Sequence, residues 1–156
     1  MTHDVETVDT GSRRVTRRMT VETTPSEIFA LLADPHRHGE LDGSGTVRDA
    51  VSGPHRVALG DRFAVNMRQL GIPYRITSTV VEDEEDRLIA WRHPVGHVWR
   101  WELEPDPEGT VVTETFDYST TLAAPMFELS GRPARNAGGI EETLRRLGAR
   151  FAGHGG

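Results

Sequence analysis

The sequence predicts an α+β fold in which a curved antiparallel sheet wraps around one long C-terminal helix. Apolar residues recur at helical spacing near both ends of the chain and at every second position between residues 46 and 118. Short turns rich in Gly, Pro and Asp separate the alternating segments, and consecutive strands joined by short turns pair antiparallel. The 156 residues fit one domain. We expect it over residues 13–152, after a flexible N-terminal tail at residues 1–12.

One strand and two short helices are predicted at the start of this domain. Residues 13–22 alternate between apolar and polar side chains, as a half-buried strand requires. In the segment that follows, Thr24 can cap a helix, Pro25 suits its first position and Glu27 completes a capping box. The pair Asp34-Pro35 ends this helix and can begin another, which must be short because three glycines follow closely.

About six further strands are predicted between the short helices and residue 118. Their alternation places one set of apolar side chains on the concave face of the sheet, where they would either fill the core or contact a ligand. The residues expected to contact a ligand are Phe63, Val65, Met67, Tyr74, Ile76, Trp91, Trp99, Trp101, Phe116 and Tyr118. The acidic run at residues 82–86 fits a solvated hairpin tip better than a cation site.

The C-terminal segment is predicted to be helical from about Ala124. An apolar stripe at i, i+4, i+7 and i+11 should pack on the sheet, and it consists of Ile140, Leu144, Leu147 and Phe151. Three glycines weaken the helix before this stripe, namely Gly131, Gly138 and Gly139. Either they leave space for a ligand, or the helix breaks near Pro133.

This order of elements is the helix-grip arrangement, and the chain resembles the SRPBCC superfamily (START, birch-pollen-allergen-like), in particular its polyketide cyclase/dehydrase-like branch. The resemblance extends over about residues 13–152 and is carried by TTPSEIFALLADP, VALGDRF, WRWELEPDPEGTVVTETFDY and IEETLRRLGARF. It implies a cavity for a hydrophobic ligand between the sheet and the long helix, and chemistry that needs no cofactor.

Two polar residues on the predicted concave face are catalytic candidates. Glu114 lies between Val112 and Phe116, so burial among apolar side chains should raise its pKa toward neutrality. His93 follows Trp91 on the same face. The alternatives are that Glu114 is wet or pairs with an arginine near the mouth, and that His93 merely ends a strand. No metal is expected, because His93 and the nearby His97 make an incomplete site.

The stretch HRHGELD is predicted to gate the cavity. On a helix, the side chains of His36 and His38 diverge by about 200 degrees, so they should not chelate one ion. The same holds for Glu40 and Asp42. We therefore expect these four residues at a flexible rim of the cavity.

Composition excludes several functions. The chain has no cysteine and its 18 basic residues are all arginine, which excludes disulfides, thiol nucleophiles and lysine Schiff bases. A net charge of -6 argues against nucleic acid as a partner. The sequence has no apolar run long enough to insert into a membrane and no signal peptide pattern, which predicts a cytoplasmic protein.

Three functional hypotheses follow. The first is a module that binds a small hydrophobic molecule, aromatic or polyketide-like, in the cavity. The second, implied by the resemblance, is a polyketide cyclase or dehydratase, for which Glu114, His93, Tyr74 and Tyr118 are the available acid-base groups and hydrogen-bond donors. The third is protein binding, like that of the chaperone ATPase activators of the same superfamily. Homodimerisation is left open.

Overall fold

The computed structural model describes residues 3–41, 47–69 and 71–153, with the backbone alone at 47–51 and 67–69. The strands of this described part form one antiparallel sheet of eight strands, in the order β1-β2-β8-β7-β6-β5-β4-β3. They are β1 (Glu6–Val8), β2 (Arg14–Val21), β3 (Val47–Ser52), β4 (Arg62–Gln69), β5 (Ile72–Glu84), β6 (Leu88–Arg92), β7 (Val98–Asp106) and β8 (Gly109–Asp117).

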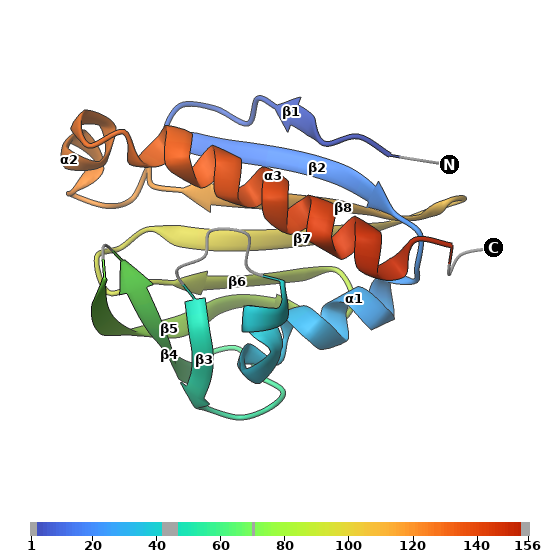
Figure 1. Ribbon diagram of the computed structural model, residues 1–156, viewed down its shortest axis with the longest axis horizontal. Coiled ribbons are helices and arrows are strands. Elements are labelled where there is room, and N and C mark those ends of the chain that lie inside the picture. The colour runs from blue at the N-terminus through green and yellow to red at the C-terminus, as the bar shows by residue number, and fades with distance from the viewer. Residues whose placement is uncertain (1–2, 42–46, 70, 154–156) are drawn as a thin grey trace.

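Helices cover one face of this sheet. They are α1 (Pro25–Leu32), the 3-10 helix η1 (Pro35–Glu40), α2 (Ala124–Leu129) and the long α3 (Arg132–Phe151). Helix α3 runs along β2 and β8, whereas η1 lies beside β3 (Figure 1). The predicted α+β helix-grip architecture is confirmed, including the two short helices that follow the first long strand.

The N-terminal segment differs from the expected flexible tail. Residues Glu6–Val8 form strand β1, which pairs antiparallel with β2 so that Glu6 lies opposite Arg18. Their side chains form an ion pair at 2.8 Å. This strand was not predicted, because three residues are too few to show alternation.

Helix α1 begins as its cap residues predict. The hydroxyl oxygen of Thr24 accepts a hydrogen bond from the backbone N–H of Glu27 at 3.4 Å, and Pro25 occupies the first turn. The carboxylate of Glu27 accepts a hydrogen bond from the hydroxyl of Thr23, and this contact takes the place of the reciprocal bond of a capping box. These two hydrogen bonds stabilise the first turn of α1 and fix the path of the chain from β2 into the helix.

The apolar stripe of α3 packs against the sheet as expected. Ile140, Leu144 and Leu147 are fully or almost fully buried, and Phe151 is partly buried against the same core. On the outer side of the helix, Arg145 and Arg146 pair with glutamates four residues earlier, at 3.5 and 3.6 Å. The core thus lies between α3 and the sheet.

The helical C-terminal segment is interrupted between α2 and α3. Gly131 precedes α3 with a φ of 75°, a left-handed conformation that favours glycine. Pro133 then lies in the first turn of α3, where its missing N–H costs nothing. The interpretation of a helix break near Pro133 therefore accounts for Gly131, but Gly138 and Gly139 lie inside the helix and need another reason.

Within residues 3–41, 47–69 and 71–153, no helix combines the length and the apolar character that crossing a membrane requires.

Candidate functional site

A cavity of about 560 Å³ lies between the sheet and the first half of α3, with η1 at one end. Its apolar lining consists of Leu32, Leu41, Phe63, Val65, Ile76, Trp91, Pro94, Val95, Trp99, Trp101 and Ile140. Its polar lining consists of His38, Tyr74, Ser78, His93, His97, Glu114, Arg132, Arg135, Asn136 and Thr143. Gly138 and Gly139 complete the helical side, so the interpretation that they leave space accounts for these two residues.

Most residues predicted to contact a ligand line this cavity. They are Phe63, Val65, Tyr74, Ile76, Trp91, Trp99 and Trp101. The side chain of Met67 lies outside the described residues. Phe116 and Tyr118 do not line the cavity, because both rings pack against Phe127 of α2, with centroids 6.2 and 6.3 Å away. Alternation placed these two rings on a face without showing that α2 covers that end of it.

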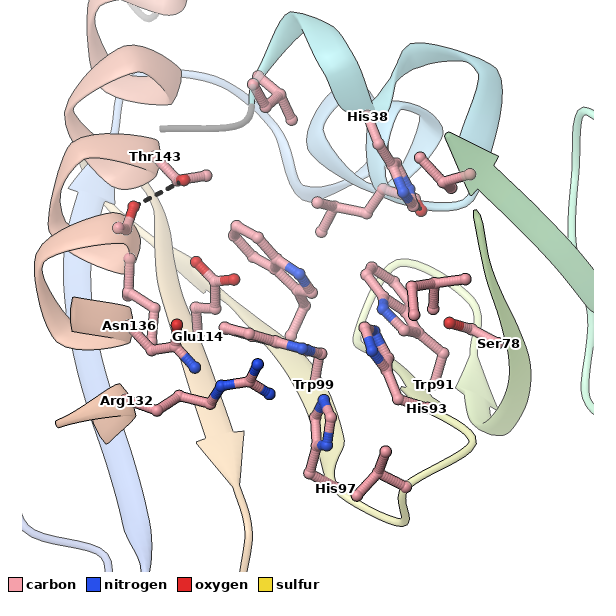
Figure 2. Close-up of a pocket in the computed structure, with 18 of the residues that line it drawn as sticks. His38, Ser78, Trp91, His93, His97, Trp99, Glu114, Arg132, Asn136 and Thr143 are labelled. Carbon is pink, nitrogen blue, oxygen red and sulfur yellow. Dashed lines mark hydrogen bonds between the residues drawn. The ribbon is translucent and has the colours of Figure 1, made fainter. Parts of the chain in front are cut away.

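The tryptophans form the centre of the cavity wall. Trp91 on β6 lies directly opposite Trp99 on β7, and Trp101 follows on the same face of β7. The ring of His38 stacks on Trp91 at 4.9 Å, and the ring of Phe63 meets Trp91 edge-on at 5.6 Å. Figure 2 shows Trp91 and Trp99 side by side in the wall of the cavity. This wall offers broad aromatic faces to a ligand.

One end of the cavity is polar and basic. His93 and His97 come from the turn between β6 and β7, and their ring centroids are 4.5 Å apart. Arg132 and Asn136 project from the first turns of α3 toward this end (Figure 2). The guanidinium carbon of Arg132 lies 4.6 Å from the centroid of the Phe127 ring, a cation-π arrangement that positions it.

Both histidines at this end are neutral at neutral pH. Burial, together with the nearby His97 and Arg132, lowers the pKa of His93 to about 3. Burial and the charge of Arg132 lower the pKa of His97 to about 4. A base whose pKa lies so far below neutrality accepts a proton poorly, which makes both rings weak general bases. They serve better as hydrogen-bonding groups.

We predict that this pair makes the protein sensitive to acid. In the unfolded chain, each histidine takes up a proton near pH 6.5, whereas the folded protein resists protonation until about pH 4 and pH 3. The unfolded state therefore binds more protons in this window, so the free energy of unfolding should fall as the pH falls from about 6.5 toward 4. His93→Gln should reduce the proton uptake on unfolding by about one proton. Urea unfolding at several pH values measures this change. An equal reduction in the exposed-site control His55→Gln would contradict the prediction.

Glu114 lies on β8 and faces the cavity. It is 6% exposed, and its neighbours on the two adjacent strands are Arg17 and Trp101. Figure 2 shows its carboxylate directed into the cavity, toward the tryptophan wall. The two predicted catalytic residues, Glu114 and His93, therefore share one cavity on different strands of its wall.

The three described residues of the predicted gate separate in the structure. His38 lines the cavity, and its ring nitrogen lies 2.7 Å from the carbonyl oxygen of Leu32. His36 points elsewhere, to the carbonyl oxygen of Gly53 at 2.9 Å, so the two imidazoles diverge as expected. Glu40 pairs with Arg150 of α3 at 2.9 Å. Asp42 lies outside the described residues, so the gate stays a prediction.

A second group of potential ligands lies away from the cavity. Asp34, His36 and His55 bring one ligand atom each within 4.8 Å of one another. A carboxylate oxygen of Asp34 lies 3.2 Å from Nδ1 of His55, and the rings of His36 and His55 stack with their centroids 4.1 Å apart. These side chains could supply three ligands to a metal ion, but their hydrogen bonds within the protein already give them a role in the turn. This group was not predicted, because His55 is distant in sequence from Asp34 and His36.

Two polar residues at the start of α3, Arg132 and Asn136, were also not predicted as cavity residues, although a signal for them exists. Arg132 and Asn136 precede Ile140 by eight and four residues, so they continue its stripe toward the start of the helix. Extending the apolar stripe backward through polar residues would have placed both in the cavity.

The space beside Gly138 gives a test of the helix. A Cβ at Gly138 would meet nothing within 4 Å, and its backbone is an ordinary helix. Gly138→Ala should therefore stabilise the protein by about 0.5–1 kcal/mol, because alanine loses less entropy in a helix. The matched control is Gly131→Ala, which has equal space but a φ of 75° and should destabilise. Urea unfolding compares the two, and destabilisation by both would contradict the prediction.

Comparisons with known proteins agree with this architecture. The family described as "Polyketide cyclase / dehydrase and lipid transport" matches residues 12–152. The Rv0088 protein of Mycobacterium tuberculosis is 45% identical over 153 residues, which cover 95% of this chain and 68% of that protein. A crystal structure from Rhodobacter sphaeroides shares the fold with a TM-score of 0.74 at 18% identity, covering 96% of this chain and 98% of the other. An AHSA1-like protein from Aeromonas hydrophila has a TM-score of 0.62 at 16% identity, covering 88% and 93%.

Proposed function

The chain belongs to the polyketide cyclase/dehydrase and lipid transport family, and from this premise we propose that it binds a small, mostly apolar molecule in the cavity between the sheet and α3. The predicted resemblance to the polyketide cyclase/dehydrase-like branch of the SRPBCC superfamily is thereby confirmed. We propose the chemical class of the ligand, and we propose that the protein binds this ligand without converting it.

The tryptophan wall is the observation that carries this proposal. All three tryptophans of the chain line one cavity, together with Phe63, Val65 and Ile76. A volume of about 560 Å³ lies within the range of about 300–1,000 Å³ that small-molecule sites occupy. A cavity of this size with no ligand would sacrifice dispersion contacts that a filled core would make, so a ligand is the natural reason for it.

Binding without turnover fits the chemistry of the histidines. A cyclase or dehydratase needs a group that exchanges protons near neutral pH, and the lowered pKa values of His93 and His97 make both rings poor at this task. The protein would then sequester or carry its ligand.

The test is a titration with N-phenyl-1-naphthylamine, a neutral apolar probe whose emission rises in a dry environment. We expect saturable binding of one probe per chain. Native mass spectrometry of gently purified protein should also detect one co-purified small molecule of fixed mass. A linear, unsaturable emission increase, together with an empty protein, would contradict the proposal.

Acid-base catalysis is the second candidate, and Glu114 is the observation that favours it. This carboxylate is almost fully buried and lines the cavity, as does Asn136, whose amide could hydrogen-bond to an oxygen of the ligand. Of the other predicted groups, Tyr74 lines the cavity, whereas the hydroxyl of Tyr118 lies 3.5 Å from Glu128 and outside it. The variant Glu114→Gln separates the two candidates.

Protein binding, the third hypothesis, and homodimerisation stay predictions. Leu122, Met126 and Leu129 are exposed at and just before α2, and such side chains are the kind of surface that a protein partner would need.

A further inference from the structure

We propose that the ligand is an organic acid, with an apolar body against the tryptophan wall and a carboxylate held by Arg132 and Arg135 at the start of α3. This inference rests on the proposed function and adds the chemical class of the ligand. It assigns the two ends of the cavity to the two ends of an amphipathic molecule.

The cavity holds the two arginines of α3 that have no acidic partner within the described part of the chain. The other arginines of the helix form ion pairs, as shown by Arg145 with Glu141, Arg146 with Glu142 and Arg150 with Glu40. Among the described residues, neither Arg132 nor Arg135 pairs with a carboxylate. These two arginines are also the ones that line the cavity.

The electrostatics at the start of α3 also favour an anionic ligand. The N-terminus of a helix carries a partial positive charge, so arginines in the first turn are unfavourable there, and acidic residues are favourable. Helix α3 has no acidic residue in its first turn and no side-chain cap, yet it places Arg132 in the first position. An anionic ligand would offset both the charge of the arginine and that of the helix end.

Arg132 is held in position by an aromatic ring. Its guanidinium lies over the Phe127 ring at 4.6 Å, so little side-chain entropy remains to be lost on binding. The planar guanidinium can donate two parallel hydrogen bonds to one carboxylate. Its charge already depresses the pKa values of His93 and His97, which places its field inside the cavity.

The same end of the cavity also carries a buried ring nitrogen of His97. The Nδ1 atom of His97 is buried and has no hydrogen-bond partner within the described part of the chain, and the residue is 4% exposed. A buried polar atom without a partner is costly, and a ligand oxygen nearby would satisfy it. Glu114 supplies the only acidic side chain among the described lining residues, whereas Arg132 and Arg135 are both cationic, so the carboxylate of a ligand would bind at the two arginines.

The experiment uses a matched pair of ligands in calorimetry at pH 7.5. 2-Naphthoate carries a carboxylate, and 2-naphthamide has the same shape without the charge. We expect the wild-type protein to bind 2-naphthoate at least 10-fold more tightly. The double variant Arg132→Gln, Arg135→Gln should lose this preference and keep its affinity for 2-naphthamide within about 2-fold. The control Arg145→Gln, on the same helix but outside the cavity, should keep the preference.

A second measurement uses the wild-type protein alone, so its result does not depend on whether the double variant folds. In the wild-type protein, 2-naphthoate should raise the NMR-measured pKa values of His93 and His97, because its charge opposes that of Arg132, whereas 2-naphthamide should not. Equal affinity for both ligands, with unchanged histidine titrations, would overturn the acid assignment and leave the proposed function standing. If the protein bound none of the three compounds, 2-naphthoate, 2-naphthamide and N-phenyl-1-naphthylamine, both the acid assignment and the proposed function would be overturned.

Discussion

Trp99→Ala should weaken the binding of N-phenyl-1-naphthylamine by about 10- to 100-fold, the equivalent of about 1.4–2.7 kcal/mol. Trp99 lies in the middle of the aromatic wall, opposite Trp91 and next to Phe116, whose ring centroid is 5.0 Å away. Removing its indole takes away a large apolar contact surface and lets water into the wall. Trp99→Phe should recover most of the affinity, because a ring remains at that place.

The matched control for Trp99 is Glu102→Ala on the same strand. Glu102 is exposed and its side chain points to the opposite face of β7. Arg100 is a poorer control, since it forms ion pairs with Glu82 at 2.6 Å and Asp117 at 3.5 Å. Fluorescence titration measures all three variants. Equal affinities for Trp99→Ala and Glu102→Ala would place the probe outside the cavity.

Glu114→Gln should leave affinity for the ligand similar or improved, because a neutral amide keeps the shape of the side chain and is easier to bury than a charge. If the protein instead turned its ligand over, the same change would remove the proton-exchanging group. Turnover would then fall by about 10²- to 10⁴-fold, with affinity nearly intact. The two accounts thus differ in turnover and agree in affinity.

The assay for Glu114 follows cyclisation of a synthetic poly-β-keto thioester by the absorbance of its aromatic product. The matched control is Glu104→Gln, an exposed position on β7. We expect no turnover above background in the wild-type protein. Turnover that Glu114→Gln abolishes and Glu104→Gln preserves would establish catalysis and contradict the carrier account.

The fold was predictable because each element carries its own period. The stripe Ile140, Leu144 and Leu147 needs an apolar surface to cover it, and the alternating strands offer one face of matching character. The caps Thr24 and Asp34 mark the starts of two short helices, and both accept hydrogen bonds there. The helix caps and the apolar periods predict the same elements that pack together in the structure, so the architecture could be predicted from the sequence.

The site was predictable only in part, because its contents depend on packing between distant elements. Alternation places Phe116 on the same face as Trp99, but the position of Phe127 decides that Phe116 is covered. The basic end of the cavity requires Arg132 to face the turn that carries His93 and His97, some 35 residues earlier in the chain. No local sequence pattern predicts that these two distant segments lie close together.

The most direct test of the central claim uses the three indole N–H signals in a ¹H–¹⁵N NMR spectrum. The chain has three tryptophans and all of them line the cavity, so these signals report on the cavity alone. Addition of N-phenyl-1-naphthylamine to one equivalent should shift all three indole signals, while the amide signals of the outer strand β1 stay in place. Saturable binding of the probe that leaves all three indole signals unchanged would contradict a ligand site between the sheet and α3.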